Sequence, residues 1–140
     1  MKKSILILLF LAAALFTSCR AQAQVIVIAN SGVKLVDISK NDLRDLFNGA
    51  STNLKDGIHA TPVLLKAGAT HNDFLNSYIG KNDTAFRANW RSLVFSGQAS
   101  MPKSLDSESD IVNFVSHNSG AIGYINKATP HDGVTVISVK

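Results

Sequence analysis

Cysteine is almost absent from this chain of 140 residues, in which Cys19 is the only one. A domain that begins after residue 23 therefore has no internal disulfide, and the burial of apolar side chains must hold it together. The four histidines show no H-x-x-x-H or H-E-x-x-H spacing. With no cysteine available to complete a ligand set, the sequence predicts no metal site.

Motifs for catalysis and nucleotide binding are absent as well. The sequence contains no G-x-S-x-G elbow, no Walker sequence and no G-x-G-x-x-G fingerprint. Its acidic residues stand at expected helix starts, where they act as caps or dipole partners rather than as a catalytic pair. We therefore expect neither an enzyme nor a protein that carries a cofactor.

Long apolar runs occur once, from Ile5 to Phe16, after Lys2 and Lys3 and before Ala21-Gln22-Ala23. A short apolar run between a basic start and an A-x-A site is typical of a bacterial export signal. It is too short to span a bilayer comfortably, which takes about 20 apolar residues. The sequence therefore predicts a signal peptide over 1–23 and one domain over 24–140, exported to the periplasm.

The stretch Phe16-Thr17-Ser18-Cys19 also resembles a lipoprotein signal, in which the cysteine becomes the lipidated first residue. We favour soluble release after Ala23, because Ala21-Gln22-Ala23 is close to the signal-peptidase pattern. A lipid anchor at Cys19 remains the alternative.

The basic charge of the chain resides mostly in its leader. Without Lys2, Lys3 and Arg20, eleven basic and ten acidic residues remain, a net charge of +1. No Lys/Arg cluster is present among residues 24–140, so the sequence offers no electrostatic footprint for nucleic acid. About 117 residues are enough to bury one core.

Hydrophobic periodicity alternates between strand and helix along the domain. Caps are expected at Ser39, at Asn82 or Asp83 and at Ser107, because each precedes an apolar helical face. We expect a loop at 99–105. The strands are expected at 25–29, 59–65, 121–125 and 134–139, and the helices at 39–48, 70–79, 83–96 and 107–118. This order predicts an α/β layered fold with helices on both faces of the sheet.

The junction between the strand at 59–65 and the following helix has the composition of an anion site. It reads Lys66-Ala67-Gly68-Ala69-Thr70-His71, and its small residues allow close approach to backbone N–H groups. The first N–H groups of a helix lack internal partners and carry the positive end of the helix dipole. Thr70 would add a hydroxyl and Lys66 a charge. A plain strand-to-helix turn, capped by Thr70, explains the same residues.

Four segments in order resemble the phosphate-binding components of bacterial ABC transporters and their short exported relatives. They are the helix at 42–49, the turn at 68–74, the stretch at 90–97 and Ser119-Gly-Ala-Ile-Gly-Tyr-Ile125, which is close to the P-G-A-I-G-Y of the family. The resemblance covers the whole domain and about one lobe of the usual two. It implies a single periplasmic-binding-protein-like lobe of type 2, with a mixed sheet and helices on both faces.

The resemblance also implies a ligand site at the same turn. In the family the turn reads approximately R-x-D-G-S-G-T. Here Gly68 stands for the Ser, Ala69 for the Gly and Thr70 for the Thr, while Leu64 replaces the Arg and Lys66 the Asp. Backbone donors and one hydroxyl are retained, and the bidentate Arg is lost. The implied ligand-binding residues are Lys66, Gly68, Ala69, Thr70 and His71.

Two functions follow from the sequence. The first is an exported solute-binding protein that takes phosphate or a related oxyanion and serves phosphate ABC transport at a membrane complex. The second is an envelope protein–protein interaction module that keeps the fold without a small ligand. The lost Arg and the missing lobe favour the second, and the retained helix start favours the first.

Overall fold

The computed structural model describes residues 24–54 and 57–140, which include one mixed β-sheet of strand order β2-β6-β1-β5-β3-β4. The predicted signal peptide and Cys19 lie outside the described residues. The strands are β1 (Val25–Asn30), β2 (Asp37–Ile38), β3 (Thr61–Leu65), β4 (Lys103–Leu105), β5 (Ala121–Asn126) and β6 (Val134–Val139). β1 runs antiparallel to both β5 and β6, whereas β3 is parallel to β5 and β4, and β2 is parallel to β6.

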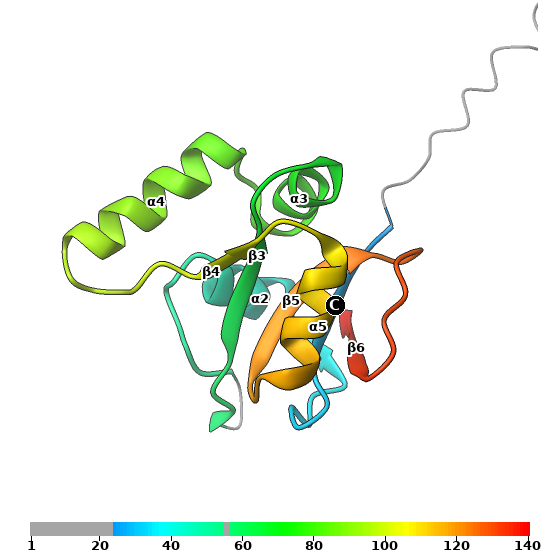
Figure 1. Ribbon diagram of the computed structural model, residues 1–140. Coiled ribbons are helices and arrows are strands. Elements are labelled where there is room, and N and C mark those ends of the chain that lie inside the picture. Colours follow the sequence, from blue (N-terminus) through cyan, green and yellow to red (C-terminus); the bar gives the residue numbers. More distant parts are fainter. Residues whose placement is uncertain (1–23, 55–56) are drawn as a thin grey trace, which may run out of the picture.

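Helices cover both faces of this sheet (Figure 1). They are α2 (Lys40–Phe47), α3 (Ala69–Phe74), the π-helix η3 (Leu75–Ile79), α4 (Asp83–Phe95) and α5 (Glu108–His117). Consecutive residues of β5 point to opposite faces. Gly123 faces α5 so closely that an added Cβ would lie 2.9 Å from Cγ2 of Ile111. Tyr124 faces the other way and stacks on Phe74 with ring centroids 3.9 Å apart. The predicted α/β fold with helices on both faces is confirmed.

Side-chain caps start three of these helices at the predicted residues. Ser39 accepts from the Asp42 N–H, Asn82 from the Ala85 N–H and Ser107 from the Asp110 N–H. Each cap satisfies an N–H group that has no carbonyl partner inside its helix. The helix starts predicted from local spacing are therefore confirmed.

Two short strands differ from the sequence-based expectation. The predicted loop at 99–105 is wrong at its end, because Lys103–Leu105 pairs with β3 as the edge strand β4. β2, a two-residue strand beside β6, was not predicted. Such short edge strands are defined by backbone pairing with a neighbour and show too few residues for an alternating pattern. Pro62 lies at the start of β3, as a proline within a strand requires.

α4 extends away from the sheet at one side of the molecule (Figure 1). Its inner face is anchored by Phe86 and Trp90, which are 1% and 3% exposed. The Trp90 indole N–H donates to the Phe47 carbonyl at 2.9 Å, and the Asn89 amide donates to the Asn48 carbonyl. The end of α2 thus holds the middle of α4. No helix in the described part of the chain has the length and apolar character needed to cross a membrane.

Candidate functional site

The turn from β3 to α3 carries the predicted site. Gly68 is the N-cap residue, with φ 111° and ψ 175°, and no side chain caps this helix start. The positive φ favours glycine, and an added Cβ would meet nothing within 4 Å. Ala69 and Gly68 are exposed. The N-cap residue of α3 therefore offers no side-chain acceptor to the first N–H groups of this helix, unlike the caps of the other three helices.

Lys66 lies at the entrance to the turn. Its ammonium group is 2.8 Å from Oδ1 of Asp106, and the two side chains are 57% and 76% exposed. An ion pair this exposed contributes little to stability, about 0–1 kcal/mol. The lysine can exchange its partner for another anion at small cost.

Thr70 is tied to an acidic side chain on α5. Its hydroxyl donates to Oε2 of Glu108 over 3.4 Å, while Oε1 of the same carboxylate accepts from the Asn126 N–H and the Thr129 hydroxyl. Glu108 thereby joins α3 to the segment after β5. A ligand oxyanion at Thr70 would have to draw the hydroxyl away from this carboxylate.

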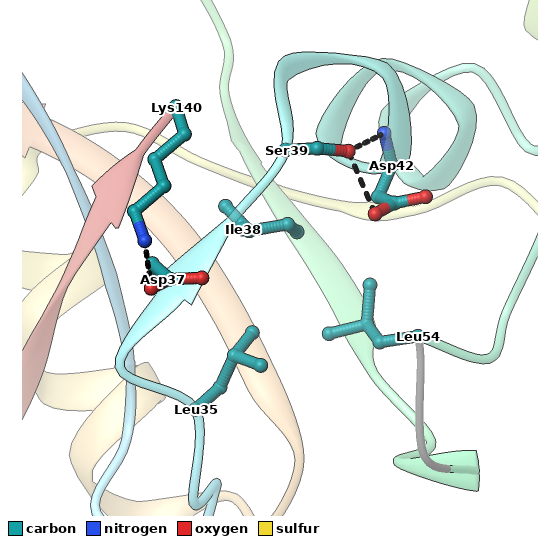
Figure 2. Close-up of a pocket in the computed structure, with 7 residues that line it drawn as sticks. All are labelled: Leu35, Asp37, Ile38, Ser39, Asp42, Leu54 and Lys140. Atoms are coloured by element: carbon teal, nitrogen blue, oxygen red, sulfur yellow. Dashed lines mark hydrogen bonds and ion pairs between the residues drawn. The ribbon is translucent and has the colours of Figure 1, made fainter.

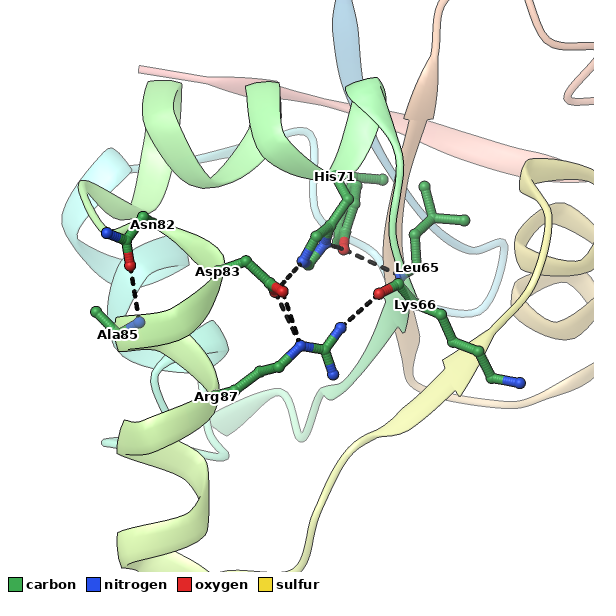
Figure 3. Close-up of polar contacts among 8 residues, drawn as sticks. Leu65, Lys66, His71, Asn82, Asp83, Ala85 and Arg87 are labelled. Atoms are coloured by element: carbon green, nitrogen blue, oxygen red, sulfur yellow. Dashed lines mark hydrogen bonds and ion pairs between the residues drawn. The ribbon is translucent and has the colours of Figure 1, made fainter.

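His71 lies beneath the turn rather than on its surface. It is 1% exposed, and both ring nitrogens have partners: Nδ1 is 2.6 Å from the Tyr124 hydroxyl and Nε2 is 2.8 Å from Oδ1 of Asp83 (Figure 3). The Asp83 carboxylate can only accept, so Nε2 of His71 donates to it, and in the neutral ring Nδ1 accepts from the Tyr124 hydroxyl. The same hydroxyl accepts from the Leu65 N–H. This chain of hydrogen bonds connects β3, β5, α3 and α4.

Arg87 brings a guanidinium group to the turn from α4. Its Nε lies 3.0 Å and 2.9 Å from the two Asp83 carboxylate oxygens, and Nη2 donates to the Lys66 carbonyl (Figure 3). Sequence reasoning did not single out Arg87. The Asp83–Arg87 spacing of four residues signals a helical ion pair, but the contact with Lys66 depends on how α4 packs.

The electrostatics of Asp83 and Tyr124 follow from these contacts. Burial would raise the pKa of Asp83, but the hydrogen bonds from His71 and Arg87 outweigh it and hold that pKa below the usual value. Burial raises the pKa of the Tyr124 hydroxyl, although its hydrogen bond from Leu65 opposes the shift. The Tyr124 hydroxyl therefore keeps its proton at neutral pH.

Comparisons with solved structures identify the fold. The alignment with the ABC-type phosphate transport receptor from Vibrio cholerae covers 83% of this chain and 46% of the receptor, at 18% identity and a TM-score of 0.63. A phosphate ABC transporter substrate-binding protein with bound phosphate from Clostridium perfringens aligns over 83% of this chain and 44% of its own, at 20% identity and a TM-score of 0.63. PstS from Borrelia burgdorferi aligns over 84% of this chain and 47% of its own, at 18% identity and a TM-score of 0.60.

The fold is periplasmic-binding-protein-like. This chain spans just under half the length of the structures it matches. No protein-family model matches the sequence, and no curated protein matches it either. The matched structures are binding proteins.

Two hollows of this periplasmic-binding-protein-like domain lie away from the turn. One, of 210 Å³, opens between β2, the start of α2 and Leu54 (Figure 2). Its polar groups have partners within the protein, since Asp37 pairs with Lys140 and Ser39 donates to Asp42. The other, of 470 Å³, lies beside Trp90, and none of its described lining residues is acidic. Among the described residues, no group of three or more metal-ligating side chains comes together.

Proposed function

We propose that this domain is an exported solute-binding protein that binds phosphate or a related oxyanion at the turn from Lys66 to His71. The observation that carries the proposal is the start of α3, where Gly68 and Ala69 are exposed and the N-cap residue provides no side-chain acceptor for the first N–H groups. An oxyanion satisfies such groups and interacts favourably with the positive end of the helix dipole. The shared fold with phosphate receptors supports the same ligand class.

Each residue of the turn has a distinct part in this proposal. Gly68 and Ala69 present backbone N–H groups, and Gly68 adds the conformation that opens the turn. Thr70 gives its hydroxyl after releasing Glu108, and Lys66 gives its ammonium group after releasing Asp106. His71 supports the turn from below, because its side chain is buried with both nitrogens paired. Arg87 fixes the Lys66 carbonyl from the side.

The test is a calorimetric and thermal-shift titration of the 24–140 chain with phosphate, and with sulfate as a second oxyanion. A ligand that binds only the folded state raises the melting temperature by mass action. Thr70→Ala removes a hydrogen bond to a charged ligand and is expected to weaken phosphate binding about tenfold. Thr84→Ala is the matched control, since Thr84 holds the equivalent second position of α4, a helix that Asn82 caps.

Two results would overturn the proposal. One is a melting temperature that does not change in millimolar phosphate. The other is saturable binding that Thr70→Ala and Thr84→Ala weaken equally, which would place the oxyanion elsewhere. Loss of binding in Thr70→Ala alone supports the turn as the site.

The cellular role follows from this proposal. A protein with the predicted leader is released in the periplasm, or is held at the membrane by a lipid on Cys19. There it would deliver its oxyanion to an ABC transporter membrane complex. Binding and delivery need no catalytic residue and no cofactor.

A second candidate function is an envelope interaction module without a small ligand. It is favoured by Leu64, which stands where the family has its arginine and is 2% exposed, buried in the core. The leucine side chain has no N–H groups to pair with an oxyanion, as an arginine would have. Absence of binding to either oxyanion, together with a folded protein, would favour this module over the first function.

A further inference from the structure

Two exposed apolar side chains are adjacent in sequence at the far end of α4. Phe95 is 96% exposed and Val94 is 42% exposed. Contact with a partner would remove this apolar surface from water, and adjacent exposed apolar side chains are a feature of interaction surfaces.

Basic residues border these side chains. Arg91 and Phe95 are four residues apart and therefore share a face of α4. Met101, on the segment that returns from α4 to β4, lines a hollow with Asp83, Arg87 and Arg91, so this segment lies against the earlier turns of that face. We call Arg91, Val94 and Phe95 the α4 tip. It forms the outer end of the helix that extends from the sheet in Figure 1.

The charge of the chain is distributed unevenly around this surface. The arm, residues 83–105 from the start of α4 to the end of β4, contains three basic residues and one acidic residue, whereas the rest of 24–140 contains eight basic and nine acidic residues. Arg91 is exposed. Arg87 is paired with Asp83, and Lys103 lies over the Phe114 ring, 5.3 Å from its centroid. The arm is thus positively charged on a body that is slightly negative.

We infer that the α4 tip binds an anionic lipid surface, with Phe95 inserted at the level of the headgroups. This role goes beyond oxyanion binding and uses other residues. An exposed aromatic side chain beside basic residues is the combination that proteins use at membrane interfaces. The charge of the tip complements anionic lipids, which attract each nearby Lys or Arg.

The experiment is sedimentation of the 24–140 chain with vesicles of phosphatidylcholine, with or without about 30% phosphatidylglycerol. All core residues of the described structure lie between Val27 and Ile137, so this chain carries that core complete. Binding is expected with the anionic vesicles and to fall as salt is added. Phe95→Ser should weaken it about tenfold, and Arg91→Gln about fivefold.

Val36→Ser is the matched control, since Val36 is another apolar side chain with 81% exposure and lies outside the arm. It is expected to leave vesicle binding unchanged. Thr70→Ala should also leave it unchanged, which separates this inference from the oxyanion proposal.

Three outcomes would overturn the inference. The first is no binding to anionic vesicles, and the second is equal binding by Phe95→Ser and the unsubstituted chain. The third is a dimer, seen by sedimentation velocity, that Phe95→Ser dissociates while vesicles bind neither form. That result would assign the tip to a second copy of the chain.

Discussion

The hydroxyl of Tyr124 lies 2.6 Å from Nδ1 of His71, although the two residues are 53 positions apart in the sequence. Because this hydroxyl also accepts from the Leu65 N–H at 3.0 Å, it gives two buried polar groups their partner at once. The contact joins the central strand β5 to the first turn of α3, directly beneath the proposed oxyanion site.

Tyr124→Phe is therefore expected to lower the free energy of unfolding by about 2–4 kcal/mol, because two buried groups lose their hydrogen bonds. Urea denaturation would measure this change. Tyr78→Phe, at the half-buried second tyrosine, should change stability by less than about 0.5 kcal/mol. Equal losses in the two variants would mean that the Tyr124 hydroxyl contributes nothing specific.

Asp83→Asn tests the charge at the other end of the same chain of hydrogen bonds. The folded-state pKa of Asp83 lies below the unfolded value of about 4, so its stabilisation is present above that value and disappears as the pH falls through the folded pKa. We expect Asp83→Asn to cost about 0.5–1 kcal/mol at neutral pH, a small value because 37% of the side chain is exposed.

The difference between Asp83→Asn and the unsubstituted protein should narrow at a pH of about 3. Asp132→Asn, at an exposed aspartate, serves as the control in urea denaturation at both pH values. A difference that stayed constant with pH would show that the charge on Asp83 has no part in the stabilisation.

Gly49 and Gly97 test how α4 is attached to the body. Both have positive φ, 77° and 74°, but an added Cβ at Gly49 would lie 2.7 Å from Leu93 and 2.9 Å from Trp90, whereas at Gly97 it would meet nothing. Gly97→Ala is expected to cost about 1–2 kcal/mol for its backbone conformation. Gly49→Ala should cost about 1–3 kcal/mol more, because α4 must move.

Fluorescence of Trp90, the only tryptophan, follows unfolding and the packing of α4 in both variants. A shifted native emission is expected for Gly49→Ala and not for Gly97→Ala. Similar free energies of unfolding for the two variants would mean that α4 can move to make room for the added methyl group without loss of stability.

Glu108→Gln tests the competition for Thr70, and it depends on the proposed function. The substitution keeps one oxygen, which can still accept from the Asn126 N–H, places an NH2 group opposite the Thr70 hydroxyl, and removes a negative charge beside the turn. Phosphate affinity is expected to rise about three- to tenfold as like-charge repulsion is lost. Asp110→Asn, two residues further along α5, is the control in the same calorimetric titration. Unchanged affinity in Glu108→Gln would argue against a ligand beside Thr70.

The local features of the fold could be predicted from the sequence. The starts of three helices can be predicted from their cap residues, Ser39, Asn82 and Ser107, because the side chain of a cap accepts from an N–H only three residues away. The alternation of strands and helices likewise gave the α/β class, since each element carries its own hydrophobic period. The resemblance to phosphate-binding proteins agrees with the fold of the solved structures.

The candidate site could be predicted only in part. The position of the turn follows from the end of β3, but the burial of His71 and the arrival of Arg87 do not, because both depend on contacts between distant elements. The edge strand β4 could not be predicted for the same reason, because its backbone hydrogen bonds are made with the distant strand β3.

The sequence by itself determined the helix caps, the order of elements and the small residues that open the turn, because these depend on neighbours within a few positions. Tertiary structure decided which of the turn's residues face solvent and which become internal partners. It placed Lys66 and Thr70 opposite Asp106 and Glu108, and it turned His71 toward Tyr124 and Asp83. The physical reason is that a polar side chain takes the partners that packing brings within about 3 Å, and chain spacing does not encode that distance.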